Sequence, residues 1–360
     1  MFNMYNKHQT HLVDERYELV SLIFRLAGNK MFREEKTHYQ RKLDAEFGKF
    51  KEHPAVKYAA EHLQDMFGDI IFLYVIHISR ENGKFVFKDV DAFTNGIVNL
   101  LAPIGRHQLE KLKVIYWTNE LATGFLALIN DFYIDSNFSE FFAGNSRFYI
   151  KHSRRYIKNV LNRISLDWFS QYGIKSDKMR VILSPTIFGV GCFGGWDLTA
   201  EPGEQTVYAL LPLQIPVSQY RMHEYIIIHE FAHSIANPLA AVWYQENETF
   251  RSWCDDSVDE KLLPHYLTGY GMACEYLTRA YTIQYLVESA NNDEEYLRRL
   301  FQYESKLGFR FIEQVYALTT ANRDAAAGAT TFLTGSRYGF RYLMLLLAEK
   351  IWHRYSFTSS

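Results

Sequence analysis

The chain has 360 residues, of which 48% are apolar and 22% charged, the balance of an ordinary globular protein. Its 39 basic and 41 acidic side chains give a formal net charge of −2. This near-neutrality argues against a nucleic-acid binder, which would carry a basic excess. No stretch reaches the roughly 18 to 20 apolar residues that a membrane-spanning helix needs, so no membrane span is expected.

The N-terminal residues lack the basic start and apolar centre of a signal peptide. The chain as printed is therefore expected to be cytoplasmic, although a chain trimmed from an exported precursor would give the same pattern. The three cysteines, Cys192, Cys254 and Cys274, have no CxxC spacing. We expect free thiols rather than a disulfide framework or a cysteine-rich zinc module. The sequence does not indicate an oligomeric state.

The first half of the chain has a mostly helical period. Residues 15–28 place Leu19, Leu22, Ile23 and Leu26 on one face and predict a helix that closes at Gly28. A polar helix over residues 36–53 should stop before Pro54, because the residue before a proline avoids the α region. Further helices are predicted over residues 55–66, 119–132 and 148–172.

The pattern changes at Met179, where β-branched and aromatic residues alternate with turn-rich segments. We predict one small sheet, with strands over residues 180–184, 188–194 and 206–212. A helix should follow from an N-cap at Ser218 to Asn237, where Pro238 would end it. The rest, from about residue 264 to residue 355, is predicted to be mainly helical. No linker or repeat separates domains, so we expect a helical half (residues 1–178) and a catalytic half (residues 179–360) packed as one compact unit.

The predicted helix after the sheet contains the segment HEFAH, residues 229–233. Two histidines four residues apart project from one helix face, at the separation that lets both bind one zinc ion. Glu230 lies beside this pair and is the expected general base for a water whose pKa the zinc lowers. The pattern predicts a zinc hydrolase with His229 and His233 as ligands and Glu230 as the catalytic residue.

A catalytic zinc needs a third protein ligand. The metzincin pattern is excluded because Ala236 and Leu239 stand where it requires glycine and histidine. Glu275 lies in an apolar helical stretch, as in the gluzincin arrangement, and we prefer it as the third ligand. A carboxylate among apolar residues needs a strong partner, and the alternative is an ion pair with Arg279 at i+4.

Other acids and one histidine compete for the third position, mostly in a polar stretch that we interpret as a solvated connection: Glu246, Glu248, Asp255, Asp256, Asp259, Glu260 and His265. An aspartate ligand from Asp255 or Asp256 would make an aspzincin-like site. Asn237 is expected either to orient an imidazole or to cap the helix end. The donor that stabilises the oxyanion is not determined, and the sequence leaves open His223, His265, the tyrosines and Arg337-Tyr338.

The chain also resembles a family of bacterial HExxH proteins that carry a domain of unknown function. The resemblance extends over most of the chain, through residues 13–28, 50–59, 128–142, 229–237 and 275–280. It implies zinc ligands at His229, His233 and Glu275 and a base at Glu230, in a gluzincin-like metallopeptidase. The expected fold is α+β: mostly helical and zincin-like, with one small β-sheet preceding the HExxH helix.

The expected function is a Zn2+-dependent hydrolysis of peptide bonds, with a peptide or protein as substrate and no nucleic-acid partner. A second class of function is a catalytically idle, zincin-like scaffold or peptide-binding protein. An intact Glu230 favours the enzyme, because binding alone does not need a base. Substrate sequence, endo- or exo-cleavage and regulation are not readable from the sequence.

Overall fold

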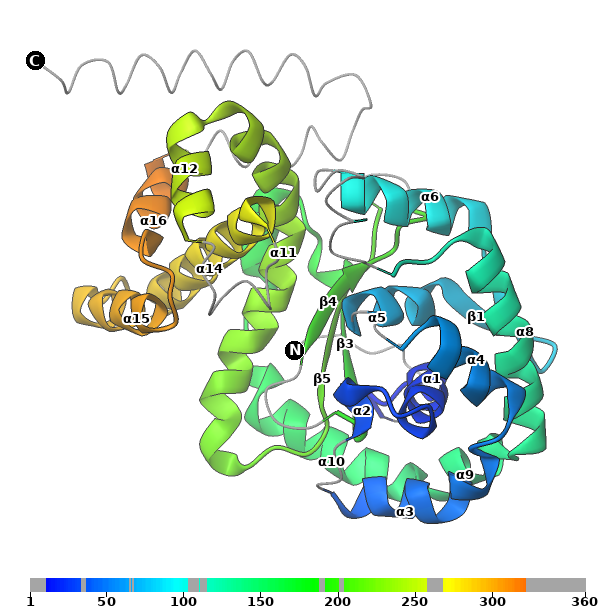
Figure 1. Ribbon diagram of the computed structural model, residues 1–360. Helices are drawn as coiled ribbons and strands as arrows, with labels where there is room; N and C mark the ends of the chain where they lie inside the picture. Colours follow the sequence, from blue (N-terminus) through cyan, green and yellow to red (C-terminus); the bar gives the residue numbers. More distant parts are fainter. Residues whose placement is uncertain are drawn as a thin grey trace, which may run out of the picture. The chain divides into compact units, whose positions relative to one another are not determined.

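The computed structural model describes residues 11–33, 37–64, 66, 68–102, 110, 115–187, 192–200, 204–257 and 268–321. Helices predominate and two small sheets accompany them, which confirms an α+β fold (Figure 1). Among the described residues, no helix has the length and apolar character required to cross a membrane. The three cysteines are free thiols, as expected.

The chain divides into two compact units. The first comprises Met1–Ile164, Met179–Thr199 and Thr206–Ile227, and the second comprises Ser165–Lys178, Ala200–Gln205 and Ile228–Ser360. This division differs from the predicted boundary between residues 178 and 179. The reason is that the strands after Met179 contact the N-terminal part of the chain. The Leu183 N–H, for example, donates to the Leu12 carbonyl at 2.9 Å.

The first unit is built from helices whose ends follow local capping rules. Helix α1 (Glu15–Leu26) begins at the N-cap Asp14 and ends just before Gly28, whose φ of +84° favours glycine. Helix α3 (His38–Phe47) begins with a capping box between Thr37 and Gln40. The other α-helices described in this unit, apart from the start of α11, are α2 (Lys30–Arg33), α4 (Pro54–His62), α5 (Gly68–His77), α6 (Val90–Leu101), α8 (Asn119–Asp135), α9 (Phe138–Gly144) and α10 (Ser146–Asn159).

The helix predicted over residues 148–172 ends earlier than expected, at Asn159 of α10. Short 3-10 turns follow it at Leu161–Arg163 and, in the second unit, at Leu166–Tyr172. In the longer turn, Leu166, Phe169 and Tyr172 are buried at three-residue spacing. This spacing is the period of a 3-10 helix and is close to that of an α-helix, so the apolar pattern did not distinguish them.

A hairpin in the first unit was not predicted, and the expectation of a single sheet is therefore wrong. Strands β1 (Ile78–Glu81) and β2 (Lys84–Phe87) pair antiparallel around Asn82 and Gly83, which both have positive φ. An Asn-Gly pair is the residue choice of a type I′ hairpin turn. The strands are only four residues long and follow directly on the apolar helix α5, which masked the alternation.

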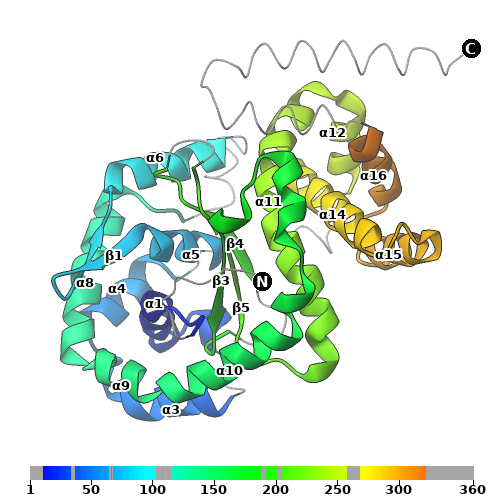
Figure 2. The same ribbon diagram turned by 180° about the vertical axis from the view of Figure 1, so that it is seen from behind.

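The predicted sheet is present in the first unit as β3 (Met179–Ser184), β4 (Phe193–Trp196) and β5 (Val207–Pro212). Its strand order is β3-β5-β4, with β3 parallel and β4 antiparallel to β5. The predicted middle strand began at residue 188, and residues 188–191 lie outside the described part. Helices α1 and α5 cover one face of this sheet, with α8 farther out on the same side (Figures 1 and 2).

Helix α11 (Tyr220–Glu246) passes through Pro238, so the prediction that this proline ends the helix is wrong. A proline inside a helix costs about 3 kcal/mol or more. The turns beyond it bury Leu239, Ala240, Val242 and Trp243 almost completely, and this burial outweighs the cost. Ser218 is not the N-cap either, because it lies in a 3-10 turn, Val217–Gln219, that precedes α11.

The second unit contains the rest of the described helices: α12 (Glu248–Asp256), α14 (Gly269–Ser289), α15 (Glu294–Lys306) and α16 (Ile312–Ala321). Helix α14 packs against the other three (Figure 2). Helix α12 corrects the interpretation of this stretch as a solvated connection. Asn247 caps it, and Phe250 and Cys254, four residues apart, are fully buried. The helical prediction for residues 322–355 lies outside the described residues.

A buried carboxyl group lies at the carboxyl end of β3 in the first unit. Glu18 of α1 is fully buried and accepts hydrogen bonds from the hydroxyls of Ser184 (2.5 Å) and Thr186 (2.6 Å). Burial raises the pKa of Glu18 to about 7, although these hydrogen bonds act in the opposite direction. Between about pH 4.5 and pH 7, Glu18 is therefore protonated in the folded protein and ionised in the unfolded chain.

This carboxyl group predicts a pH-dependent stability. Because the folded pKa is raised, stability is greatest below the unfolded pKa and declines as pH rises toward 7. Glu18→Gln lacks this titrating group. The free energy of unfolding of the variant, relative to that of the parent, should therefore rise by about 2 kcal/mol from pH 5 to pH 8. Urea denaturation of both proteins at the two pH values measures the difference. A difference that does not change with pH would contradict the raised pKa.

Candidate metal centre

Two imidazoles lie one turn apart on α11, within the second unit. The helix is held in place by the apolar residues around the motif, since Phe231, Ala232 and Ile235 are fully buried. The ring centres of His229 and His233 are 5.0 Å apart and their planes are nearly perpendicular. The local spacing of the motif therefore gives the arrangement that the sequence predicted.

The third side chain comes from α14, which Thr268 caps. Glu275 Oε2 lies 3.6 Å from His229 Nε2, and Glu275 Oε1 lies 3.4 Å from His233 Nε2. One ligand atom from each of the three side chains lies within 4.8 Å of the other two. The exposed fractions of the side chains are 11% for His229, 18% for His233 and 12% for Glu275, so the group is largely withdrawn from solvent.

Two neighbours orient the ring of His233. Its Nδ1 lies 3.0 Å from Thr278 Oγ1 and 3.1 Å from Asn237 Oδ1. The Thr278 hydroxyl donates its proton to the Cys274 carbonyl at 2.7 Å, so its oxygen is left to accept from Nδ1–H. Both neighbours thus favour the tautomer whose Nε2 carries a lone pair and faces Glu275. Because α11 continues beyond Asn237, the alternative that this residue caps the helix end is wrong.

The second imidazole is held in its neutral form. Burial, reinforced by the nearby His233 and Arg279, lowers the pKa of His229 well below its ordinary value. A neutral imidazole offers a nitrogen lone pair, and this is the form that binds metals. At neutral pH the His229 side chain is therefore available as a ligand without first losing a proton.

Arg279 lies beside Glu275, as the alternative of an ion pair between the two residues required, but it also contacts Glu304 and Phe309. Its Nε is 3.3 Å from Glu275 Oε2, whereas its NH1 donates to Glu304 Oε2 at 2.6 Å. Glu304 is fully buried, and the guanidinium lies 3.9 Å from the ring centre of Phe309. Arg279 is thus anchored by Glu304 and Phe309 and supports one oxygen of Glu275, while the other oxygen faces His233.

Glu230 follows His229 on α11 and is only 6% exposed. Near it, Glu275 and Glu304 both pair with the guanidinium of Arg279. These two carboxylates and one guanidinium carry a formal charge of −1, beside the lone pairs of the metal-facing imidazole nitrogens. A divalent cation would offset this charge, which is costly to bury alone.

The competing ligand candidates that the structure describes do not join this cluster. Asp255 and Asp256 are exposed on α12, where Asp255 accepts a hydrogen bond from the Tyr244 hydroxyl at 2.7 Å. Glu246 and Glu248 are also exposed. Asp259, Glu260, His265 and Arg337-Tyr338 lie outside the described residues. Within the described ranges, the only His, Cys, Asp and Glu side chains grouped closely enough to hold a metal are His229, His233 and Glu275.

The supporting residues Thr278 and Glu304 were not predicted. Thr278 stands three positions after Glu275, where a residue on the same helix face could have been noticed. Glu304 lies 29 residues beyond Glu275 on α15, and no local pattern connects it to the motif. Its role depends on how α14 and α15 pack, which the sequence does not state.

Residues 11–326 match the model of a protein family described as a domain of unknown function, DUF4932. The chain belongs to this family, because the match covers most of its length. The expected membership in an uncharacterised family is thus confirmed. Neither the curated proteins nor the solved structures contain a match to this chain.

Proposed function

We propose that the protein is a zinc-dependent metallopeptidase with a gluzincin-like site, in which His229, His233 and Glu275 hold the metal. The observation that carries this proposal is the convergence of two imidazole nitrogens on the two oxygens of one carboxylate, at 3.6 and 3.4 Å. Two nitrogens and one carboxylate oxygen are a donor set of catalytic zinc sites, which keep a further position open.

The donor set fits the metal in chemical terms as well as in geometry. The imidazole nitrogens that bind a metal offer lone pairs, and here they face a carboxylate, so a cation between the three groups relieves the resulting repulsion. Thr278 and Asn237 hold His233 in the required tautomer, as residues behind metal ligands commonly do. Arg279 restrains the Glu275 carboxylate through Oε2.

When bound, zinc would supply Lewis acidity that polarises a carbonyl group and acidifies water. Glu230 is then the residue of this chain that takes the proton from the attacking water and passes it to the leaving amine. Its low exposure favours this role, because a carboxylate withdrawn from solvent is a better proton acceptor than one that water stabilises. We also propose that the second unit, which carries the metal-binding residues, is related to the zincins.

Metal content tests the site directly. Protein purified without chelator should contain one zinc per chain by elemental analysis, and His233→Ala should contain less than about a tenth of that amount, because it retains only two of the three ligands. His62→Ala, which alters an exposed histidine on α4, serves as the matched control and should keep the full zinc content. Equal zinc content in the His233→Ala protein and the parent would contradict the assignment.

A further inference from the structure

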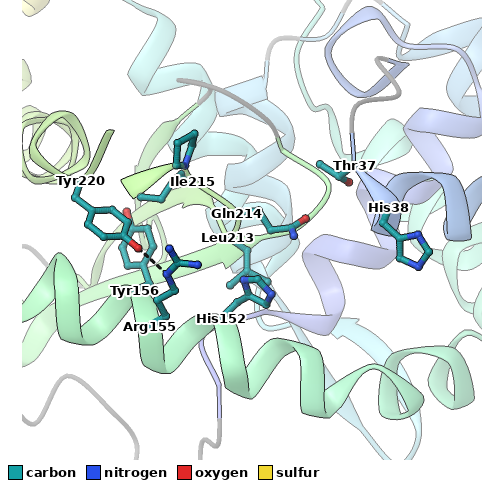
Figure 3. Close-up of a pocket in the computed structure, with 10 residues that line it drawn as sticks. Thr37, His38, His152, Arg155, Tyr156, Leu213, Gln214, Ile215 and Tyr220 are labelled. Carbon is teal, nitrogen blue, oxygen red and sulfur yellow. Dashed lines mark hydrogen bonds between the residues drawn. The ribbon is translucent and has the colours of Figure 1, made fainter. Parts of the chain in front are cut away.

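A cavity of about 350 Å³ lies in the first unit, next to the segment that leaves the carboxyl end of β5. Its walls come from the start of α3, from α10, from residues 213–216 and from the start of α11 (Figure 3). The volume is in the range of pockets that hold small organic ligands. Its lining includes Thr37, His38, His152, Arg155, Gln214 and Tyr220.

The cavity has a basic lining. Arg155, His152 and His38 contribute to it, and none of the described lining residues is acidic. Burial, and after it the positive charges of Lys151 and Arg155, lower the pKa of His152, so this imidazole is mainly neutral at pH 7 and Arg155 contributes the fixed positive charge of the lining. Such a lining favours an anion over a neutral or cationic ligand.

The guanidinium of Arg155 is placed to bind that anion. Its Nε donates to the Tyr220 hydroxyl at 2.7 Å, and this hydrogen bond restrains the otherwise exposed side chain. Among the described residues, no carboxylate lies within ion-pair distance of it, so its terminal nitrogens remain available for a ligand. Figure 3 shows Arg155 rising from α10 toward Tyr220 and residues 213–216. A planar guanidinium held in this way matches a carboxylate in two parallel hydrogen bonds.

The remaining walls distinguish an organic ligand from an inorganic anion. Leu213, Ile215 and Pro216 give the cavity an apolar side. Gln214 Oε1 is buried and accepts no hydrogen bond from the described residues, so it can accept one from a ligand N–H. The wall is also firmly held, because the Tyr156 hydroxyl is bonded to the fully buried His223 at 3.0 Å.

We propose that this cavity binds an amino acid or short peptide through its free C-terminal carboxylate. Arg155 receives the carboxylate, Gln214 accepts an N–H of the ligand, and the apolar side contacts the last side chain. The site consists of residues of the first unit alone and does not depend on the proposed zinc chemistry.

The test compares a carboxylate with the matching amide. The probes are N-acetylated dipeptides ending in alanine, leucine, phenylalanine, lysine or aspartate, each as free acid and as C-terminal amide. Binding is measured by calorimetry in EDTA, so that no metal can hold the carboxylate. At least one acid should bind at a stoichiometry of one per chain, with its amide at least about tenfold weaker, because a charged hydrogen bond is lost.

Arg155→Gln should weaken binding of that acid at least about tenfold and leave the amide unchanged. Arg154→Gln, an exposed neighbour on α10, is the matched control and should bind as the parent does. Three outcomes would overturn the proposal: no acid binds, acid and amide bind equally well, or inorganic phosphate displaces the acid at the same concentration as the acid itself.

Discussion

Replacing Glu230 with glutamine should reduce peptide hydrolysis at least about a hundredfold while zinc content stays that of the parent. The amide keeps the shape of the side chain and leaves His229 and His233 unchanged, but it cannot accept a proton. Positioned proton transfer contributes about 10² to 10⁴ in rate, and this contribution is what the variant loses. The melting temperature should stay within a few degrees of the parent, since the glutamine side chain keeps the volume of the glutamate and its amide oxygen can still accept hydrogen bonds.

The measurement is hydrolysis of a mixed peptide library with and without chelator, followed by initial rates on whichever peptide the parent cleaves. Glu246→Gln is the matched control, because Glu246 is an exposed glutamate at the end of the same helix. It should cleave at the parent's rate. If Glu230→Gln kept full activity, Glu230 would not be the base; if the parent cleaved nothing with zinc bound, the peptidase proposal itself would fail.

The sequence predicted the part of this site that depends on local spacing. His229 and His233 meet because residues four apart share a face in any α-helix, and this holds wherever the helix lies in the fold. Glu275 was found by a different argument, namely that a carboxylate in an apolar helical stretch needs a strong partner. The structure places it with both imidazoles and with Arg279, so the two interpretations of this glutamate describe contacts that exist together.

The errors arose where packing outweighs a local rule. Pro238 is a helix breaker by local preference, yet burial of Trp243 and its neighbours keeps α11 continuous. The Asn82-Gly83 turn carried a readable hairpin signal, but the adjoining strands were too short to stand out beside α5. The cavity at Arg155 joins α3, α10 and the start of α11, and no sequence pattern records that these segments meet.

Replacing Glu275 with glutamine should weaken zinc binding at least about a hundredfold, and its activity should fall as a consequence. Loss of a residue behind a metal ligand costs about 10- to 100-fold in affinity, and loss of a charged ligand itself should cost no less. In EDTA the variant should lose less stability than a variant that breaks the pair between Arg279 and Glu304, since Arg279 keeps Glu304 and Phe309.

Glu304→Gln is the contrasting variant, because it removes the other carboxylate that pairs with Arg279. Glu304 is fully buried and bonded to Arg279 at 2.6 Å, and breaking a buried pair costs about 3 kcal/mol or more. In EDTA this variant should therefore be the less stable of the two, while its zinc affinity stays within about tenfold of the parent. Competition titration against a chromogenic chelator and urea denaturation measure the two quantities. If instead Glu275→Gln bound zinc normally and unfolded as easily as Glu304→Gln, Glu275 would serve Arg279 as an ion-pair partner and the metal would have another third ligand.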